Sequence, residues 1–148
     1  SIGFKKRECT LLFMTKYYFD TCIWRDYYEN REDNFRPLGE WALMLIKNIE
    51  EEKGYILYSN LIIDELKNVF DDAQIKELFS VTTQLIRVHT SEIQAQEARM
   101  INQIRKVGFA DAMHVVLARD NNAILVTRDN HFIDLTDIAS IKKPEELL

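Results

Sequence analysis

Short β-prone runs alternate along this chain with longer stretches in which apolar residues have helical spacing. The β-prone runs predict strands at 17–20 (YYFD), 55–59 (YILYS), 85–89 (LIRVH) and 123–127 (AILVT). Helical spacing predicts helices over 40–53, over 60–70, beginning in 71–80, from 91 to before Gly108, and from about 110. This alternation predicts an α/β domain with a mostly parallel sheet. Right-handed crossovers would place the helices on both faces of that sheet.

Several residues have the chemistry expected at the ends of these elements. Gly54 follows the helix at 40–53 and is a good C-terminal stop. Asn60 is the expected N-cap of the next helix, and Ser91 with Gln94 fits a capping box. The polar, turn-prone segment 30–39 is expected to be an exposed loop, and a polar tail follows the last predicted strand.

Composition and charge limit the classes of protein to consider. The 148 residues fit one domain that can bury a core. Cys9 and Cys22 are too few for a disulfide framework, which favours a reduced, cytoplasmic setting. No apolar run is long enough to span a bilayer. The net charge of −5 argues against a broad basic surface for nucleic acid, unless a metal site supplies positive charge locally.

The start of the chain suggests a boundary. The segment MTKYYFDTCIW, from Met14, looks like a natural beginning that runs directly into the first strand. We therefore expect a domain over 14–148, with residues 1–13 as an N-terminal extension. The alternative is that TLLFM belongs to the first strand. The basic cluster before it lacks the long apolar core and the small-residue cleavage site of a signal peptide.

Four acidic residues fall where strands end or helices begin. They are Asp20 after the first strand, Glu65 early in the helix at 60–70, Asp111 at the start of the helix from about 110, and Asp129 after the last strand. Ligand sites in parallel sheets lie at the carboxyl ends of the strands, so the four carboxylates are expected to converge. Without a cation they would repel one another, whereas Mg²⁺ and Mn²⁺ prefer oxygen ligands. The matching chemistry is metal-assisted hydrolysis of phosphodiesters.

Each of these acids also has an ordinary explanation. Asp111 or Glu65 alone fits an acid near a helix N-terminus, where the helix dipole favours negative charge. Asp129, in TRDNHF, fits the first residue of an Asx turn. From the residues alone, both interpretations stay open.

Three segments together match a known pattern. The first segment, YYFDTCIW, has an opening strand followed by an Asp. In the second, YSNLIIDEL, an acid follows Ser59 by six residues. The third, GFADAMHVVLARDNNAILVTRDNHF, has an Asp-Ala helix, a strand and Thr-x-Asp. In this order they resemble the PIN-domain family, which includes the VapC-like toxin ribonucleases. The resemblance runs from about Met14 to the region of Pro144, and its last block is the most specific.

The resemblance implies a three-layer PIN-like fold, with a mostly parallel sheet of about four to five strands flanked by helices. It implies an acidic pocket that holds Mg²⁺ or Mn²⁺ and hydrolyses RNA. The residues that match the metal-binding and catalytic acids are Asp20, Glu65, Asp111 and Asp129. Thr127 matches a supporting hydroxyl, and Thr21 is a weaker supporting candidate. Asp64 could replace Glu65, although the spacing from Ser59 favours Glu65, and Asp134 is at most peripheral.

The resemblance also suggests partners: an RNA substrate, a small antitoxin if the protein is a toxin, and a second copy in a homodimer. One departure bears on the toxin role. The segment RDYYENREDNFRPLGEW is longer and more polar than the compact toxin pattern. It puts the toxin role in doubt more than the nuclease fold, so a housekeeping RNA-processing nuclease competes with a toxin. The alternative from another class is a catalytically silent PIN-like scaffold that binds RNA or a protein, which the acidic net charge and this segment keep open.

Basic and aromatic residues near the expected site have weaker signals. Arg25 and Arg128 are candidates for substrate phosphates, because arginine binds phosphate bidentately, but each is also an ordinary surface residue. The aromatic residues at 24, 27 and 28 could stack on bases or pack in the core. His89, His114 and His131 are scattered and form no convincing zinc site or general base.

Other sheet folds with ligand sites fit less well. A dinucleotide-binding domain needs a glycine-rich turn after the first strand, yet DTCIWRD has none. A phosphate-receiver domain would have adjacent acids at its first strand and a lysine at a late strand end, and neither feature is clear in this sequence. A haloacid-dehalogenase-like phosphatase would have Asp-x-Asp, whereas Asp20 is followed by Thr21 and Cys22.

Overall fold

A computed structural model describes residues 14–33 and 36–148. The expected extension at residues 1–13, and with it the alternative for TLLFM, lies outside the described residues. Within the described part of the chain, no helix is both long and apolar enough to cross a membrane.

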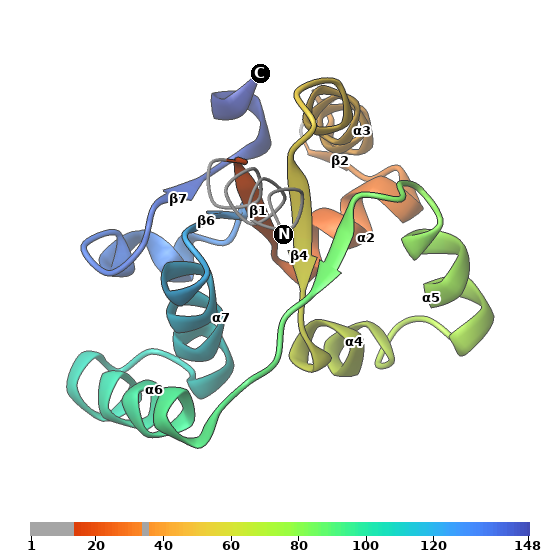
Figure 1. Ribbon diagram of the computed structural model, residues 1–148. Helices are drawn as coiled ribbons and strands as arrows, with labels where there is room; N and C mark the ends of the chain where they lie inside the picture. Colours follow the sequence, from red (N-terminus) through yellow and green to blue (C-terminus); the bar gives the residue numbers. More distant parts are fainter. Residues whose placement is uncertain (1–13, 34–35) are drawn as a thin grey trace, which may run out of the picture.

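A central sheet of five parallel strands has the order β5-β4-β1-β6-β7 (Figure 1). The strands are β1 (Lys16–Phe19), β4 (Tyr55–Tyr58), β5 (Leu85–Arg87), β6 (Ala123–Val126) and β7 (Ile141–Lys142). In the register, Lys16 pairs with Tyr55 on one side and with Ala123 on the other. The carboxyl end of β1 therefore lies between those of β4 and β6, at the middle of the sheet edge.

Helices cover both faces of the sheet. Those on one side are α2 (Thr21–Glu29), α3 (Leu38–Glu51), α4 (Asn60–Leu66) and α5 (Asp72–Phe79), and those on the other are α6 (Glu92–Arg105) and α7 (Phe109–Asp120) (Figure 1). The shorter elements are the hairpin β2 (Glu32–Asp33) and β3 (Arg36–Pro37) and the 3-10 helices η1 (Asn130–Leu135) and η2 (Pro144–Leu147). This architecture confirms the expected α/β class, with a parallel sheet of five strands flanked by helices.

Four of the five strands begin and end within two residues of their predicted limits, because each is a short apolar run bounded by polar residues. The exception is β7, which lies in the expected polar tail. It is only two residues long, and it joins the sheet through backbone bonds from Leu125 N–H to the Ser140 carbonyl (2.9 Å) and from Thr127 N–H to the Lys142 carbonyl (3.0 Å). A strand this short has no alternating pattern by which sequence could identify it.

The segment 30–39 is not simply an exposed loop. It contains the β2–β3 hairpin, and α3 begins at Leu38, two residues earlier than predicted. Leu38 and Gly39 are both buried. A Cβ atom at Gly39 would lie 2.7 Å from the Asp26 carbonyl oxygen, so this glycine lets α3 pack closely on α2.

Two predictions about helix ends are corrected. Asn60 is the first residue of α4, and the N-cap is Ser59, whose hydroxyl makes a tertiary contact and no capping bond. Gly54 is not the left-handed residue after α3, because that conformation belongs to Lys53 (φ 59°). A Cβ atom at Gly54 would lie 2.8 Å from the Thr15 carbonyl oxygen, so the glycine is needed where β4 approaches β1.

The helix α7 is buried along most of its length. Residues 112–118 are all buried, because the helix packs against β6 on one side and against α6 on another. A helix held on two sides leaves little freedom to its side chains. Asp111 at its first turn and His114 one turn later therefore have fixed positions relative to the sheet edge.

Candidate active site

Asp20 lies at the carboxyl end of the central strand and is the N-cap of α2. Its Oδ1 accepts a hydrogen bond from the Thr21 backbone N–H at 2.8 Å. Its Oδ2 accepts from the Thr127 hydroxyl at 2.8 Å and from the Cys22 thiol at 3.3 Å. Three donors therefore fix a carboxylate that is only 7% exposed.

Glu65 approaches Asp20 from α4. Its Oε2 accepts a hydrogen bond from the Thr21 hydroxyl at 2.5 Å, and its Oε1 lies 2.7 Å from His114 Nε2. Burial raises the pKa of Glu65, but the hydrogen bond and charge of His114, with the Thr21 bond, outweigh burial and leave the pKa below its ordinary value. Glu65 is therefore an ionised carboxylate at neutral pH.

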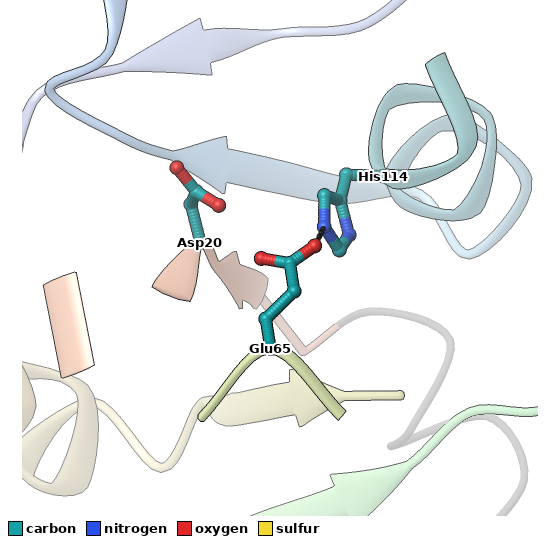
Figure 2. A group of neighbouring side chains, drawn as sticks. All are labelled: Asp20, Glu65 and His114. Atoms are coloured by element: carbon teal, nitrogen blue, oxygen red, sulfur yellow. Dashed lines mark hydrogen bonds and ion pairs between the residues drawn. The ribbon is translucent and has the colours of Figure 1, made fainter. Parts of the chain in front are cut away.

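Asp20, Glu65 and His114 converge from β1, α4 and α7 (Figure 2). One oxygen or nitrogen atom from each lies within 4.8 Å of those of the other two. Among residues 14–33 and 36–148, this is the one group of at least three acidic, histidine or cysteine side chains close enough to share an ion. Two of the four expected acids thus come together directly.

Asp111 and Asp129 belong to the same region but not to that tight group. Asp111 is in the first turn of α7, and Asp129 follows β6 as the N-cap of η1. Burial raises the pKa of Asp111, and the charges of Asp129 and then of Asp20 raise it further, against partial relief from His114 and His131. Asp111 is thus within electrostatic reach of both acids, and their like charges oppose one another.

The raised pKa of Asp111 predicts that Asp111→Asn stabilises the protein in EDTA at pH 7–8, by about 1–3 °C in Tm. A carboxyl whose pKa is raised on folding gives its full stabilisation below the ordinary pKa, and this stabilisation is lost as pH rises through the higher value. Asn does not ionise, so its advantage should vanish near pH 3. Thermal melts of both proteins between pH 3 and 8 test this. A lower Tm for the variant at pH 7 would show that the charge is stabilising.

Thr127 and Thr21, the two expected supporting residues, each contact the acids. The Thr127 hydroxyl donates to Asp20 and accepts from the Asp129 backbone N–H at 3.0 Å, so it joins the ends of β1 and β6. Thr21 joins Asp20 and Glu65, because its backbone N–H donates to Asp20 and its hydroxyl donates to Glu65.

Cys22 has no nucleophilic character. Burial raises the pKa of its thiol to about 12, and the adjacent Asp20 charge contributes to the shift. The thiol is therefore protonated and acts as a weak donor to Asp20.

The two arginines expected near substrate differ in their surroundings. Arg25 is partly exposed and pairs with Glu29 at 3.5 Å. Arg128 is only 16% exposed, and it pairs with Asp26 at 3.3 Å and with Glu145 at 2.8 Å. Its guanidinium thus joins the segment after β6 to α2 and η2, and its contact with substrate stays a prediction.

A pocket of about 210 Å³ opens directly beside Asp129. Its walls come from the end of β6, from η1 and from the segment of β7 that leads into η2. Phe132 and Ile133 supply apolar surface, while Lys142 and Lys143 supply positive charge. The pocket is therefore a concave, partly basic surface that includes Asp129.

His114 is the participant that sequence analysis missed. It was set aside because no spaced histidine or cysteine accompanies it. Its partners Tyr18 and Glu65 are 96 and 49 residues away in sequence, so no local pattern marks the contact. The one usable signal was its position three residues after Asp111, which places both on one face of the helix.

Comparison with known families identifies the domain. The sequence profile that describes the PIN domain matches residues 17–138. The chain belongs to the PIN-domain family. Comparison with curated proteins gives no match.

Solved structures with low sequence identity share the fold of this PIN domain. A chain from VapBC2 of Rickettsia felis, bound to a promoter DNA fragment, has TM-score 0.63 at 17% identity, over 86% of this chain and 98% of that one. A chain from a Klebsiella pneumoniae toxin–antitoxin complex has TM-score 0.60 at 20% identity, over 86% and 97%. A chain from FitAcB of Neisseria gonorrhoeae has TM-score 0.59 at 12% identity, over 88% and 99%.

Proposed function

We propose that this PIN domain is a divalent-metal-dependent ribonuclease that hydrolyses RNA phosphodiesters. The observation that supports it most is the convergence of Asp20 and Glu65, with Asp111 close by, at the carboxyl end of the central strand. Ligand sites in sheets of this kind lie at that edge. Membership of the PIN family points to the same chemistry.

The donor set fits Mg²⁺ or Mn²⁺. Both ions prefer oxygen ligands, and Asp20 and Glu65 are buried or half-buried carboxylates with lone pairs not used by their protein donors. The unfavourable charge at Asp111 is relieved when a cation is present. We propose that these three residues and Asp129 hold the cation. When bound, it would polarise a phosphodiester oxygen and lower the pKa of a water molecule.

The protein's own residues would orient both reactants. Thr127 and Thr21 fix the acids by hydrogen bonds, so the carboxylates need no rearrangement when a cation enters. The pocket beside Asp129 would receive the RNA strand, with Lys142 and Lys143 near its phosphates. Arg25 is a further candidate at the rim. This local positive charge matters because the whole chain has a net charge of −5.

We further propose that the domain is the toxin of a toxin–antitoxin pair. The supporting observation is that the similar structures include complexes described as VapBC2 and as a toxin–antitoxin complex. A small antitoxin would then be the protein partner in the cytoplasm, and a homodimer is the expected assembly. An adjacent reading frame for a short DNA-binding protein would support this role.

The first test is cleavage of a labelled single-stranded RNA pool in Mn²⁺, Mg²⁺ or EDTA. We expect cutting with at least one metal, none in EDTA, and a loss of about 100-fold or more in Asp111→Asn, because a carboxylate that holds the cation is removed. Asp134→Asn is the matched control, since Asp134 is exposed on η1 and its side chain makes no ion pair with the described residues.

The outcomes separate the two functions. Metal-dependent cleavage that is lost in Asp111→Asn but kept in Asp134→Asn supports the ribonuclease. A folded protein that binds Mn²⁺ and RNA without cutting supports the silent scaffold. Cleavage that persists in EDTA and in Asp111→Asn would contradict the proposed site.

A further inference from the structure

A continuous line of hydrogen bonds leads from the protein interior to Glu65. The Tyr18 hydroxyl lies 2.7 Å from Ser59 Oγ and 2.8 Å from His114 Nδ1. On the other side of the ring, His114 Nε2 lies 2.7 Å from Glu65 Oε1 (Figure 2). Ser59, Tyr18 and His114 are at most 1% exposed, so water does not compete for these contacts.

The direction of each bond follows from the donors present. An ionised carboxylate only accepts, so the hydrogen must lie on His114 Nε2. In the neutral ring, Nδ1 is then an acceptor, so the Tyr18 hydroxyl donates to it and the Ser59 hydroxyl donates to Tyr18. Burial raises the pKa of Tyr18 well above its ordinary range, so it is a hydroxyl and not a phenolate.

This arrangement leaves His114 no free lone pair for a metal ion. Nε2 donates its hydrogen to Glu65, and Nδ1 accepts from the Tyr18 hydroxyl on the buried side. Turning the ring to present a lone pair would break two hydrogen bonds at a position 1% exposed, and each buried group left unpaired costs about 1–3 kcal/mol. Glu65 keeps lone pairs for a cation, because only one donor contacts each of its oxygens.

We propose that His114 is a positioning residue, held by Tyr18 and Ser59, that orients the Glu65 carboxylate toward Asp20 and does not itself ligate the cation. The inference rests on the proposed function, because that function assigns Glu65 to the cation. Partners that bind and orient a metal ligand typically change metal affinity or activity by about 10–100-fold when removed. The close group of three side chains is therefore two carboxylate ligands and one residue that acts through Glu65.

The test measures Mn²⁺ in the full chain by electron paramagnetic resonance, with the nitrogen coupling read from electron spin echo modulation. We expect no histidine nitrogen coupling to bound Mn²⁺ in the unmodified protein. We expect His114→Leu to weaken Mn²⁺ binding by about 10–100-fold, since the donor to Glu65 is lost. RNA cleavage by this variant should recover when Mn²⁺ is raised to saturation, because the ligands themselves are intact.

Two further variants separate positioning from simple packing. His114→Gln keeps a side-chain N–H that reaches Glu65, and it should bind Mn²⁺ within about threefold of the unmodified protein. Tyr18→Phe keeps the buried ring but removes the hydroxyl that holds Nδ1, and it should weaken Mn²⁺ binding by about 3–10-fold. Thermal melting in EDTA reports the stability of each variant. If His114→Leu fails to fold, Tyr18→Phe still tests the proposal.

Histidine nitrogen coupling in the unmodified protein, lost in His114→Leu, would overturn the proposal and make His114 a ligand. Unchanged Mn²⁺ affinity in both His114→Leu and Tyr18→Phe would also overturn it. Failure of the unmodified chain to bind Mn²⁺ would overturn both this proposal and the proposed function. Mn²⁺ binding with the expected variant pattern but without RNA cleavage would contradict the ribonuclease alone.

Discussion

Asp20→Asn should reduce RNA cleavage by about 10³-fold or more, since loss of roughly 4 kcal/mol of metal-derived stabilisation corresponds to that factor. Asp20 is the most central of the acids, at the end of the middle strand and between Glu65 and Thr127. Replacing one carboxylate oxygen by an amide nitrogen removes the charge and one ligand atom. Cleavage rates under single-turnover conditions, together with Mn²⁺ binding, measure the effect.

The fold should tolerate this change. Asn is as good an N-cap as Asp, so the bond from the Thr21 N–H is kept. The new amide can donate to the Thr127 hydroxyl, which can turn its own hydrogen toward Cys22, 3.6 Å away. Loss of cleavage with an unchanged Tm would therefore report on chemistry.

Asp71→Asn is the matched control. Asp71 is the N-cap of α5, so this variant has the same Asp-to-Asn change at an exposed helix end. It should cleave at the unmodified rate. Equal cleavage by Asp20→Asn and the unmodified protein would exclude Asp20 from the reaction and contradict the proposed site.

The features that sequence predicted well are those with local causes. The apolar runs YYF and AILV form β1 and β6 as predicted, and the parallel topology places the ends of both strands, which precede Asp20 and Asp129, at one edge. The capping box at Ser91 and Gln94 is confirmed, because it needs only residues three positions apart.

The features that sequence did not predict depend on tertiary contacts. The two residues of β7 are a strand only because β6 pairs with them. His114 gains its role from Tyr18 and Glu65, which come from other elements. The Ser59 hydroxyl contacts Tyr18 and makes no capping bond, and local propensity does not indicate this tertiary contact. The ion pairs of Arg128 could not be predicted from sequence either, because its partners lie on α2 and η2.

Arg128→Met should destabilise the protein by about 3 kcal/mol, the cost of leaving a buried charge without its partner, with a fall in Tm of about 6–12 °C. The Asp26 side chain is 4% exposed. Without Arg128 its remaining ion pair would be with Arg31, which is 3.7 Å away and has a side chain that is 44% exposed. Urea unfolding at pH 7 measures the change. If Arg128 instead serves mainly as an RNA contact, the free energy of unfolding would be unaffected and RNA affinity would fall.

The pH dependence identifies the group responsible for that loss. Burial raises the pKa of Asp26, and the charges of Arg31 and Arg128 only partly oppose it. Without Arg128 the pKa of Asp26 rises further, so the loss of stability is present at neutral pH and disappears as pH falls below the ordinary value of 3.8.

Adding Asp26→Leu to Arg128→Met should restore part of the stability at pH 7, because no unpaired charge is left in the interior. An additive loss in the double variant would show that the two side chains act independently.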